Sequence, residues 1–368
     1  MTTPVTTPDT PPTDAATSAV PAPVHGGRPS GRPLSHSFPA AVFGGLTVVA
    51  VVLGLLTDLN VVLLVLLVAV VGTAVVVGVS RRVEGRRTAT DRFVTCLVYG
   101  AFALAMVPLV SLVWTVLSKG LTRLDGEFFG SSMLGVVGPG GGAYHAIMGT
   151  LIITGITALM SVPIGLLTSI YLVEYGRGRL AKAITFLVDV MTGIPSIVSG
   201  LFAYALFALF FGPGTYSGFA GSVALSVLMI PVVVRSSEEV LKLVPNELRE
   251  AAYALGVPRW RTIVKVVLPT ALAGLGTAVT LAIARVIGET APLLVTAGYT
   301  TVTNVDPFHN QMVSLPVYAY IQLTSPGVPP ENGINRAWAA ALVLIVIVLA
   351  LNLLARLISR IFAPRTGR

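Results

Sequence analysis

Apolar residues run in long stretches along this chain, and charged residues gather in the short segments between them. A helix needs about 20 apolar residues to cross the hydrocarbon core of a bilayer. Eight stretches meet that requirement, at residues 38–56, 61–80, 92–118, 146–175, 181–211, 217–236, 268–298 and 336–358. The pattern therefore predicts an all-α integral membrane protein with about eight spans.

The distribution of Lys and Arg predicts which ends of these spans face the cytoplasm. Segments 81–92, 176–182 and 235–265 hold five, three and six basic residues, and the chain after 355 holds four. The alternate connections hold none at 57–60, two at 119–145, none at 212–216 and one at 299–336. Because cytoplasmic loops carry the excess of Lys and Arg, we expect both termini and segment 235–265 to be cytoplasmic.

Composition supports a multi-pass membrane protein and excludes several other classes. Mean hydropathy is +0.85 and only 11% of residues are charged. The net charge of +8 does not indicate a nucleic acid partner, because the basic residues lie beside apolar spans. Cys96 is the single cysteine and the four histidines are scattered, so we expect no disulfide framework and no metal site.

The N-terminal 80 residues divide into two parts. Residues 1–37 are rich in Pro, Thr, Ser and Ala and have no signal-peptide pattern, so we expect a disordered cytoplasmic tail. The spans at 38–80 contain mostly Val, Leu, Ala and Gly, which suits peripheral helices in contact with membrane lipid. The later spans contain Pro, Gly, Ser, Thr and a few charges, so function is expected there.

The cytoplasmic segment 237–269 contains the sequence EAAYALGVPRWRTIVKVVLP at 250–269. Pro245 and Asn246 predict a helix start, with Asn246 as N-cap, and Gly256 is suited to a left-handed helix end. Pro258 predicts the first turn of a second helix, which Pro269 separates from the next span. An apolar stripe on the first helix comprises Leu248, Ala251, Ala252 and Leu255. We expect a helix, glycine turn, helix unit.

Two other interpretations of this unit are open. The helices could lie on the bilayer surface, as amphipathic helices often do. A DNA-binding helix-turn-helix is less compatible with the sequence, because membrane spans tether the unit at both ends and would hinder entry into a groove.

The exact residue pattern favours a protein-docking role. Glu250-Ala251-Ala252, then Gly256, then Leu268-Pro269 resembles the EAA loop of permease subunits in type I ABC importers, with Val266 where Ile is usual. The resemblance implies coupling helices that dock into a groove on a cytoplasmic ATPase. The residues that carry this expected role are Glu250, Ala251, Ala252, Leu255, Gly256 and Arg259.

The ATPase itself is expected to be another subunit. No Gly-x-x-x-x-Gly-Lys-Ser/Thr sequence occurs in the chain, so ATP and Mg²⁺ would be bound by the partner, and this chain would have no cofactor and no catalytic residue. The glycine run GPGGG at 138–142 has no lysine and no preceding strand. We expect it to be a flexible extracytoplasmic loop.

Ionisable residues within spans are candidates for a substrate pathway, since a charge at mid-membrane costs roughly 2.5 to 3.5 kcal/mol. Arg285 and Glu289 are four residues apart, which predicts a pair on one helix face. The pair could be structural, or Arg285 could bind an oxyanion and be held in place by Glu289. Asp189 is expected to partner an arginine, and Arg235 is either a cytoplasmic anchor or the inner end of the same pathway.

Four further motifs extend the resemblance to phosphate-specific importer permeases of the PstA type. They are ARVIGETAPLL at 284–294, GGGAYHAIMGTL at 140–151, TGIPSIVSGLF at 192–202 and MVSLPVYAY at 312–320. The resemblance covers about 92–362 and implies a type I importer permease domain with six core helices. The spans at 38–80 are an extra N-terminal transmembrane hairpin, since such subunits ordinarily have six spans.

The resemblance also implies an assembly and an activity. The expected partners are a related second permease subunit, a dimeric cytoplasmic ABC ATPase and an extracytoplasmic phosphate-binding protein. The pathway would import inorganic phosphate by alternating access, with Arg285 and Arg235 associated with its passage. Other oxyanions such as sulfate or molybdate, or a passive anion channel or membrane sensor, are the competing hypotheses.

Overall fold

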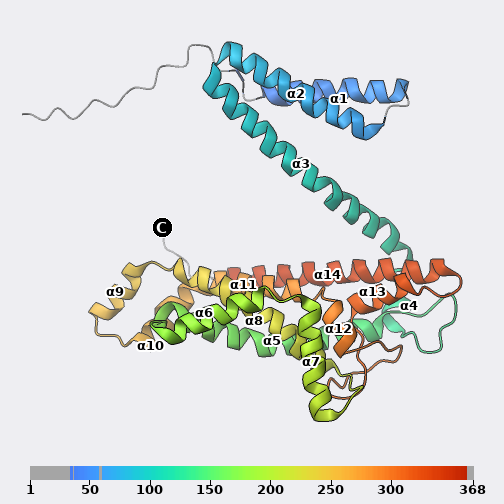
Figure 1. Ribbon diagram of the computed structural model, residues 1–368, viewed down its shortest axis with the longest axis vertical. Coiled ribbons are helices and arrows are strands. Elements are labelled where there is room, and N and C mark those ends of the chain that lie inside the picture. Colours follow the sequence, from blue (N-terminus) through green and yellow to red (C-terminus); the bar gives the residue numbers. More distant parts are fainter. Residues whose placement is uncertain (1–33, 36, 58–59, 363–368) are drawn as a thin grey trace, which may run out of the picture. The chain divides into compact units, whose positions relative to one another are not determined.

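The computed structural model describes residues 34–35, 37–57 and 60–362, and every regular element within them is helical. Almost all of the expected tail at 1–37 lies outside the described residues. The chain divides into two units, Met1–Val110 and Ser111–Arg368, and each is described by itself. Figure 1 shows the helices of both units.

The first unit contains a pair of helices, α1 (Phe38–Leu56) and α2 (Val61–Val83), followed by the start of α3 (Arg86–Gly120). The Asn60 side chain accepts a hydrogen bond from the Val62 N–H at 2.9 Å and so caps α2. Gly72 allows the two helices to pack closely, because a Cβ there would lie 2.5 Å from the Phe43 ring. These helices otherwise expose long Val and Leu side chains, which suits a lipid environment.

A buried ion pair closes this unit where α2 ends. Arg92 donates from Nε and Nη2 to the two carboxylate oxygens of Glu84, at 2.7 and 2.8 Å. The Ser80 hydroxyl and the Leu34 N–H donate to the same carboxylate at 2.6 and 2.8 Å. The hydrogen bond from Arg92, helped by those from Ser80 and Leu34, lowers the pKa of Glu84 to about 2, although its burial acts in the opposite direction.

The second unit contains the end of α3, a short turn η1 (Leu121–Arg123) and the remaining helices. These are α4 (Gly126–Gly130), α5 (Tyr144–Ile170), α6 (Arg179–Thr192), α7 (Ser196–Phe211), α8 (Gly218–Lys242), α9 (Asn246–Ala254), α10 (Arg259–Thr262), α11 (Leu268–Val286), α12 (Ala291–Thr296), α13 (Leu315–Thr324) and α14 (Pro330–Phe362). Two π-helical turns extend them, η2 (Tyr171–Tyr175) after α5 and η3 (Ile263–Val267) before α11.

Helices α5 and α8 form the centre of this unit. Gly165 permits their close approach, since a Cβ there would lie 2.6 Å from Val233. Buried hydroxyls replace some of the apolar packing: Thr157 donates to the Ser222 carbonyl at 3.3 Å, and Ser222 donates to the Ile153 carbonyl at 3.2 Å. Such small and hydroxyl residues are typical of helix contacts in membranes. Helices α11, α12, α13 and α14 complete the bundle around this pair.

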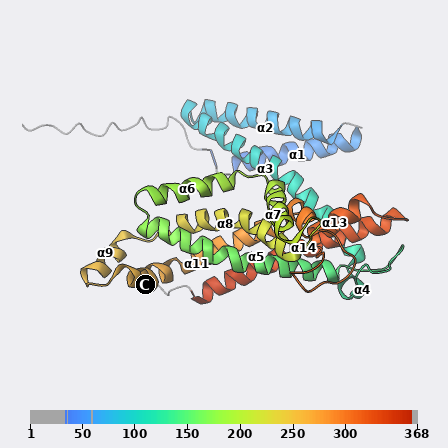
Figure 2. The same ribbon diagram turned by 60° about the horizontal axis from the view of Figure 1, so that its bottom comes forward.

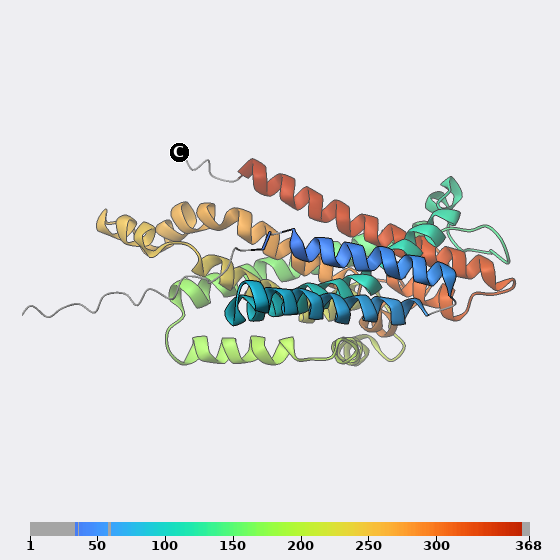
Figure 3. The same ribbon diagram turned by 90° about the horizontal axis from the view of Figure 1, so that it is seen from above.

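The expected spans are present with two differences. Within the described residues, seven helices are long and apolar enough to cross a membrane, or eight if the bent pair α6 and α7 is one span. Residues 181–211 were expected to form one span, but α6 and α7 meet at 107°. Pro195 disfavours a helical conformation at Ile194 and so separates the two helices. In Figure 3, α6 lies along the bundle while α7 is seen end-on.

The second difference concerns the span expected at 268–298. Helix α11 ends at Val286, and a non-helical stretch leads to the short helix α12, which begins at Ala291. The helix thus breaks before Pro292, which instead occupies the first turn of α12. A proline is well tolerated there because no intrahelical partner awaits its missing N–H.

The hairpin α9–α10 lies at one end of the second unit, and α4 lies at the opposite end (Figure 2). The C-terminal end of α14 lies at the hairpin's end in all three views. The segments expected to be cytoplasmic therefore share one end of this unit.

Candidate functional site

The hairpin between α9 and α10 has the glycine turn that the sequence predicts. Gly256 has φ of 75°, the Val257 N–H donates to the Ala252 carbonyl at 3.1 Å, and the Gly256 N–H donates to the Tyr253 carbonyl at 2.9 Å. These two bonds form a Schellman motif, which satisfies the last carbonyls of α9. A residue with a Cβ would be strained at this φ, which explains the glycine.

Two details of the hairpin differ from the sequence prediction. Pro245, with extended backbone, occupies the capping position, and Asn246 is the first helical residue. The Asn246 side chain accepts a bond from Arg249 at 3.2 Å instead of capping the helix. The second helix is also continuous with the next span, because α10, η3 and α11 form one segment from Arg259 to Val286. The wider turn η3 precedes Pro269 and accommodates its missing donor.

The hairpin presents an apolar surface with charged neighbours. Leu255 is 83% exposed, and Leu248 and Ala251 are also exposed. Ala252, which was expected on the same partner-facing surface, is instead buried against the bundle. Glu250 and Arg259 are exposed, and neither forms an ion pair with another described residue. Exposed leucines beside free charges suit a protein interface with a polar rim.

Asp189 and Arg235 come together, as the sequence analysis expected for Asp189. The guanidinium of Arg235 on α8 pairs with the Asp189 carboxylate on α6, and its Nη1 donates to Glu238 at 2.9 Å. Lys242 donates to the other oxygen of Glu238 at 2.7 Å. The result is a network of four side chains of alternating charge: Asp189 on α6, and Arg235, Glu238 and Lys242 on α8.

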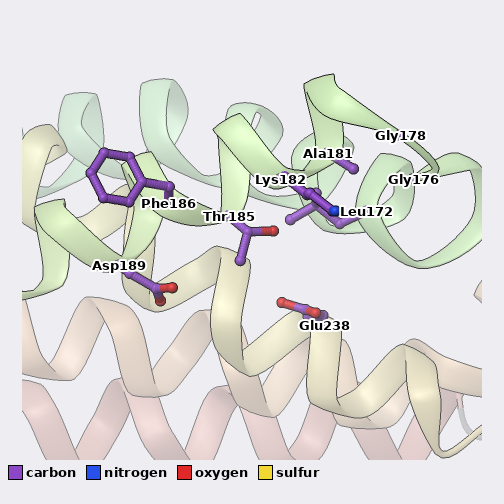
Figure 4. Close-up of a pocket in the computed structure, with 9 residues that line it drawn as sticks. All are labelled: Leu172, Gly176, Gly178, Ala181, Lys182, Thr185, Phe186, Asp189 and Glu238. Atoms are coloured by element: carbon purple, nitrogen blue, oxygen red, sulfur yellow. The ribbon is translucent and has the colours of Figure 1, made fainter.

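This charge network borders a pocket of about 430 Å³, which is lined by α6, by α8 and by the segment that follows α5. Thr185 and Asp189 on α6 and Glu238 on α8 point into the same space (Figure 4). Lys182 also lines the pocket, so both signs of charge reach it. An anion entering here would meet Lys182 and the carboxylates of Asp189 and Glu238, and both carboxylates are bound to Arg235.

Arg285 and Glu289 are not paired, contrary to the sequence prediction. Arg285 is on the last turn of α11, whereas Glu289 follows the end of that helix, where its N–H donates to the Val286 carbonyl at 3.1 Å. Without a continuing helix, the spacing of four residues no longer places the two side chains on one face. Arg285 is exposed and Glu289 is half-buried, and no ion pair joins them in the described chain.

Hydrogen bonds from two arginines reach the glycine run at 138–142, which the sequence predicts to be a flexible extracytoplasmic loop. Buried Arg336 on α14 donates to the carbonyls of Gly138 and Gly140, each at 3.0 Å. Arg123 donates to the Gly141 carbonyl at 2.8 Å. Together the two guanidinium groups satisfy three carbonyls of this loop, two through Arg336 and one through Arg123.

Arg249 and Glu174 are two further charged residues that the sequence analysis did not single out. They form a partly buried ion pair at 3.0 Å between α9 and η2. One signal was available: Arg249 directly precedes the EAA sequence, and Glu174 interrupts the apolar end of a span. Their separation of 75 residues concealed the contact.

No group of three or more His, Cys, Asp or Glu side chains that could hold a metal occurs in the described part of the chain. The charged side chains at the pocket and on the hairpin carry guanidinium, ammonium and carboxylate groups. These groups can bind and release an anion and can contact a protein partner.

The family described as binding-protein-dependent transport system inner membrane component matches residues 161–368. The chain is similar to the phosphate transport system permease protein PstA 1 of Mycobacterium tuberculosis (strain ATCC 25618 / H37Rv), with 46% identity over 79% of this chain and 94% of that protein. It is also similar to PstA of Pasteurella multocida (strain Pm70), with 41% identity over 70% and 88%, and to PstA of Yersinia pestis, with 36% over 76% and 92%.

Two solved structures share the fold. One is a bacterial alginate ABC transporter in complex with an alginate pentasaccharide-bound periplasmic protein; its TM-score is 0.55 at 14% identity, covering 76% of this chain and 97% of that chain. The other is a bacterial ABC transporter involved in the import of alginate, with a TM-score of 0.51 at 16% identity, covering 75% and 99%. At these identities the two similarities support the arrangement of the helices and nothing further.

Proposed function

We propose a function from the premise that this chain belongs to the family of binding-protein-dependent transport system inner membrane components: it is the permease subunit of an ATP-driven importer of inorganic phosphate. Relatives at 36% to 46% identity that are named phosphate transport system permease proteins support the substrate. The observation that carries the proposal is the exposed α9–α10 hairpin with its EAA sequence, at the end of the bundle where the basic segments gather.

The hairpin is the docking site for a dimeric cytoplasmic ATPase, which binds ATP and Mg²⁺ in place of this chain. Exposed Leu248 and Leu255 supply apolar contact, and Glu250 and Arg259 supply the charged rim. Because α10 continues into α11, any movement of the hairpin also moves the membrane helix α11. That helix carries Arg285 at its far end.

The remaining partners follow from this orientation. The hairpin and both termini face the cytoplasm, and the opposite end of the bundle receives an extracytoplasmic phosphate-binding protein. A related second permease completes the pathway. Residues 92–362 form the permease domain with coupling loop 237–269, while the extra hairpin at 38–80 faces membrane lipid, which its exposed apolar side chains support.

Phosphate passes by alternating access along Arg235 and Arg285. A guanidinium presents several donors in a fork that suits a phosphate oxyanion. Asp189 occupies the Arg235 guanidinium when no substrate is bound, and Glu289 lies beyond the end of α11 as a second acidic neighbour of the pathway. Exchange of a carboxylate for phosphate at Arg235 costs little, because one anion replaces another.

Reconstitution tests the proposal. The chain, its second permease and the ATPase are placed in vesicles with the binding protein, and uptake of labelled phosphate is measured. We expect uptake that requires ATP, that stops with a catalytically inactive ATPase, and that excess sulfate or molybdate does not compete away. Uptake without ATP, or equal competition by sulfate, would contradict the proposal.

A further inference from the structure

Arg249, the residue directly before the EAA sequence, joins the hairpin to two membrane helices at once. Its Nε and Nη2 donate to Glu174 Oε1 at 3.1 and 3.0 Å, which reaches η2 at the end of α5. Its Nη1 donates to the Val244 carbonyl at 2.6 Å, and Nη2 donates to the Leu241 carbonyl at 3.0 Å. One side chain on α9 therefore binds the ends of both α5 and α8.

The contact is shielded from water. The side chains of Arg249 and Glu174 are 12% and 6% exposed. Beside them a separate apolar cluster packs the ends of α8, η3 and α11 together; its buried members are Leu241, Val244, Val267, Ala271 and Leu275. Removing one partner from such a pair leaves a buried charge unpaired, so the contact resists opening far more than a surface ion pair does.

Both legs of the hairpin meet the bundle at π-helical turns. Glu174 lies within η2, Tyr171–Tyr175, and the second leg enters η3, Ile263–Val267. Such turns are rare and frequently mark functional sites in helices. The second leg is covalently continuous with α11, whereas a short connection joins the first leg to α8 and the bonds of Arg249 tie it to the ends of α5 and α8.

We propose that the Arg249–Glu174 pair is a rigid link that carries movement of α9 to the ends of α5 and α8. This inference rests on the proposed function, in which an ATPase moves the hairpin. With the link, α5, α8 and α11 respond together; without it, α11 still responds while α5 and α8 lag behind. Arg249 and Glu174 are thus positioning residues that do not touch the substrate.

The geometry requires arginine and not merely a positive charge. Three nitrogens of one planar group reach a carboxylate and two carbonyls on different elements. A lysine ammonium is a single point of donation on a flexible stem and cannot hold the same three acceptors in fixed directions.

The first test measures phosphate uptake and ATP hydrolysis in the same vesicles. We expect Arg249→Lys and Glu174→Gln each to lower the phosphate imported per ATP by about fivefold or more, while ATP hydrolysis continues. Glu84→Gln is the matched control, since it removes an equally buried carboxylate from the first unit, and its ratio should equal that of the parent chain. Parental ratios in both link variants would overturn the inference.

The second test needs no substrate and first leaves the pair intact. In a Cys96→Ser background, nitroxide labels on Arg177→Cys and Glu247→Cys, both exposed positions, report the distance between the segment after η2 and α9. We expect this distance to be unchanged by ATP, because the two segments move as one body, and its distribution to broaden when Glu174→Gln is then added. An ATP-dependent change in the otherwise unmodified complex would overturn the link. A complex that imports no phosphate would refute the proposed function alone.

Discussion

The guanidinium of Arg235 on α8 pairs with the Asp189 carboxylate on α6, and it also binds Glu238 one turn further along α8 at 2.9 Å. The side chains of Arg235 and Asp189 are 33% and 59% exposed. An ion pair that solvent can reach contributes about 0 to 1 kcal/mol to stability. The Arg235–Asp189 pair therefore affects the availability of Arg235 for an anion more than it affects the stability of the fold.

Removing Asp189 should change substrate binding and not stability. We expect Asp189→Asn to lower the KM for phosphate, because the carboxylate no longer competes for Arg235, and to change the free energy of unfolding by no more than about 1 kcal/mol. Arg235→Gln should reduce uptake by roughly tenfold or more, since a charge-assisted bond to the oxyanion is lost. Lys242→Gln, which removes a bond to Glu238 while the Arg235–Asp189 pair stays in place, is the control. Normal uptake by Arg235→Gln would make Arg235 a membrane anchor.

Arg285 and Glu289 should act independently, since no ion pair joins them. Arg285→Gln is expected to lower uptake without preventing assembly, because the side chain is exposed. In a double-mutant cycle with Glu289→Gln, the interaction energy from uptake rates should be below about 0.5 kcal/mol. A larger value would show that the two groups meet during the transport cycle.

Gly256 tests the hairpin turn. Its φ of 75° strains any residue with a Cβ, although a Cβ there would contact nothing. Gly256→Ala should therefore destabilise the turn by about 1 kcal/mol and weaken ATPase binding by roughly fivefold, and Gly256→Asn should be milder. Gly276→Ala in α11 also meets open space but has ordinary helical backbone, so it should bind normally. The affinity of each of the three variants for the immobilised ATPase is the measurement.

The variant Gly149→Ala tests helix packing near the start of α5. A Cβ there would lie 2.1 Å from the Val313 carbonyl oxygen, so the backbone must shift. We expect Gly149→Ala to cost about 1 to 3 kcal/mol and to lower the melting temperature of the purified chain by several degrees. Gly155→Ala lies on the same helix and meets nothing within 4 Å. That variant should melt at the same temperature or slightly higher, because alanine favours helix.

The lowered pKa of Glu84 predicts that the stability of the first unit depends on pH. Its folded pKa of about 2 lies below the ordinary value of 4.5, so the ion pair stabilises the fold above about pH 4.5 and loses that contribution as pH falls toward 2. Glu84→Gln should melt at a lower temperature than the parent chain at pH 7, and the gap should narrow below pH 4.5. A gap that stays constant down to pH 3 would contradict this assignment.

Much of the fold followed from local pattern. The spans at 38–56 and 61–80 and the glycine turn at Gly256 depend on runs of apolar residues and on a single backbone conformation, both of which are local properties. The breaks after Thr192 and Val286 were harder to place. Apolar residues lie close on both sides of each break, so hydropathy averaged along the chain does not reveal where the helix ends.

The candidate site divides in the same way. The EAA pattern identified the hairpin, and the expectation that Asp189 partners an arginine was confirmed by its pair with Arg235. The expected pairing of Arg285 with Glu289 was wrong, because it assumed that α11 continues past Val286. The spacing rule holds only while the helix lasts.

The sequence by itself determined an all-helical membrane protein, the position of the α9–α10 hairpin and the family, because these depend on hydropathy, basic flanks and a short motif, all of which are local features of the chain. Only the tertiary structure decided that Arg249 binds Glu174, that Arg336 holds the glycine run and that Ala252 faces inward. Those contacts join residues far apart in the chain or depend on which face a helix turns to its neighbours. Partners of buried charges are chosen by packing, which no local pattern records.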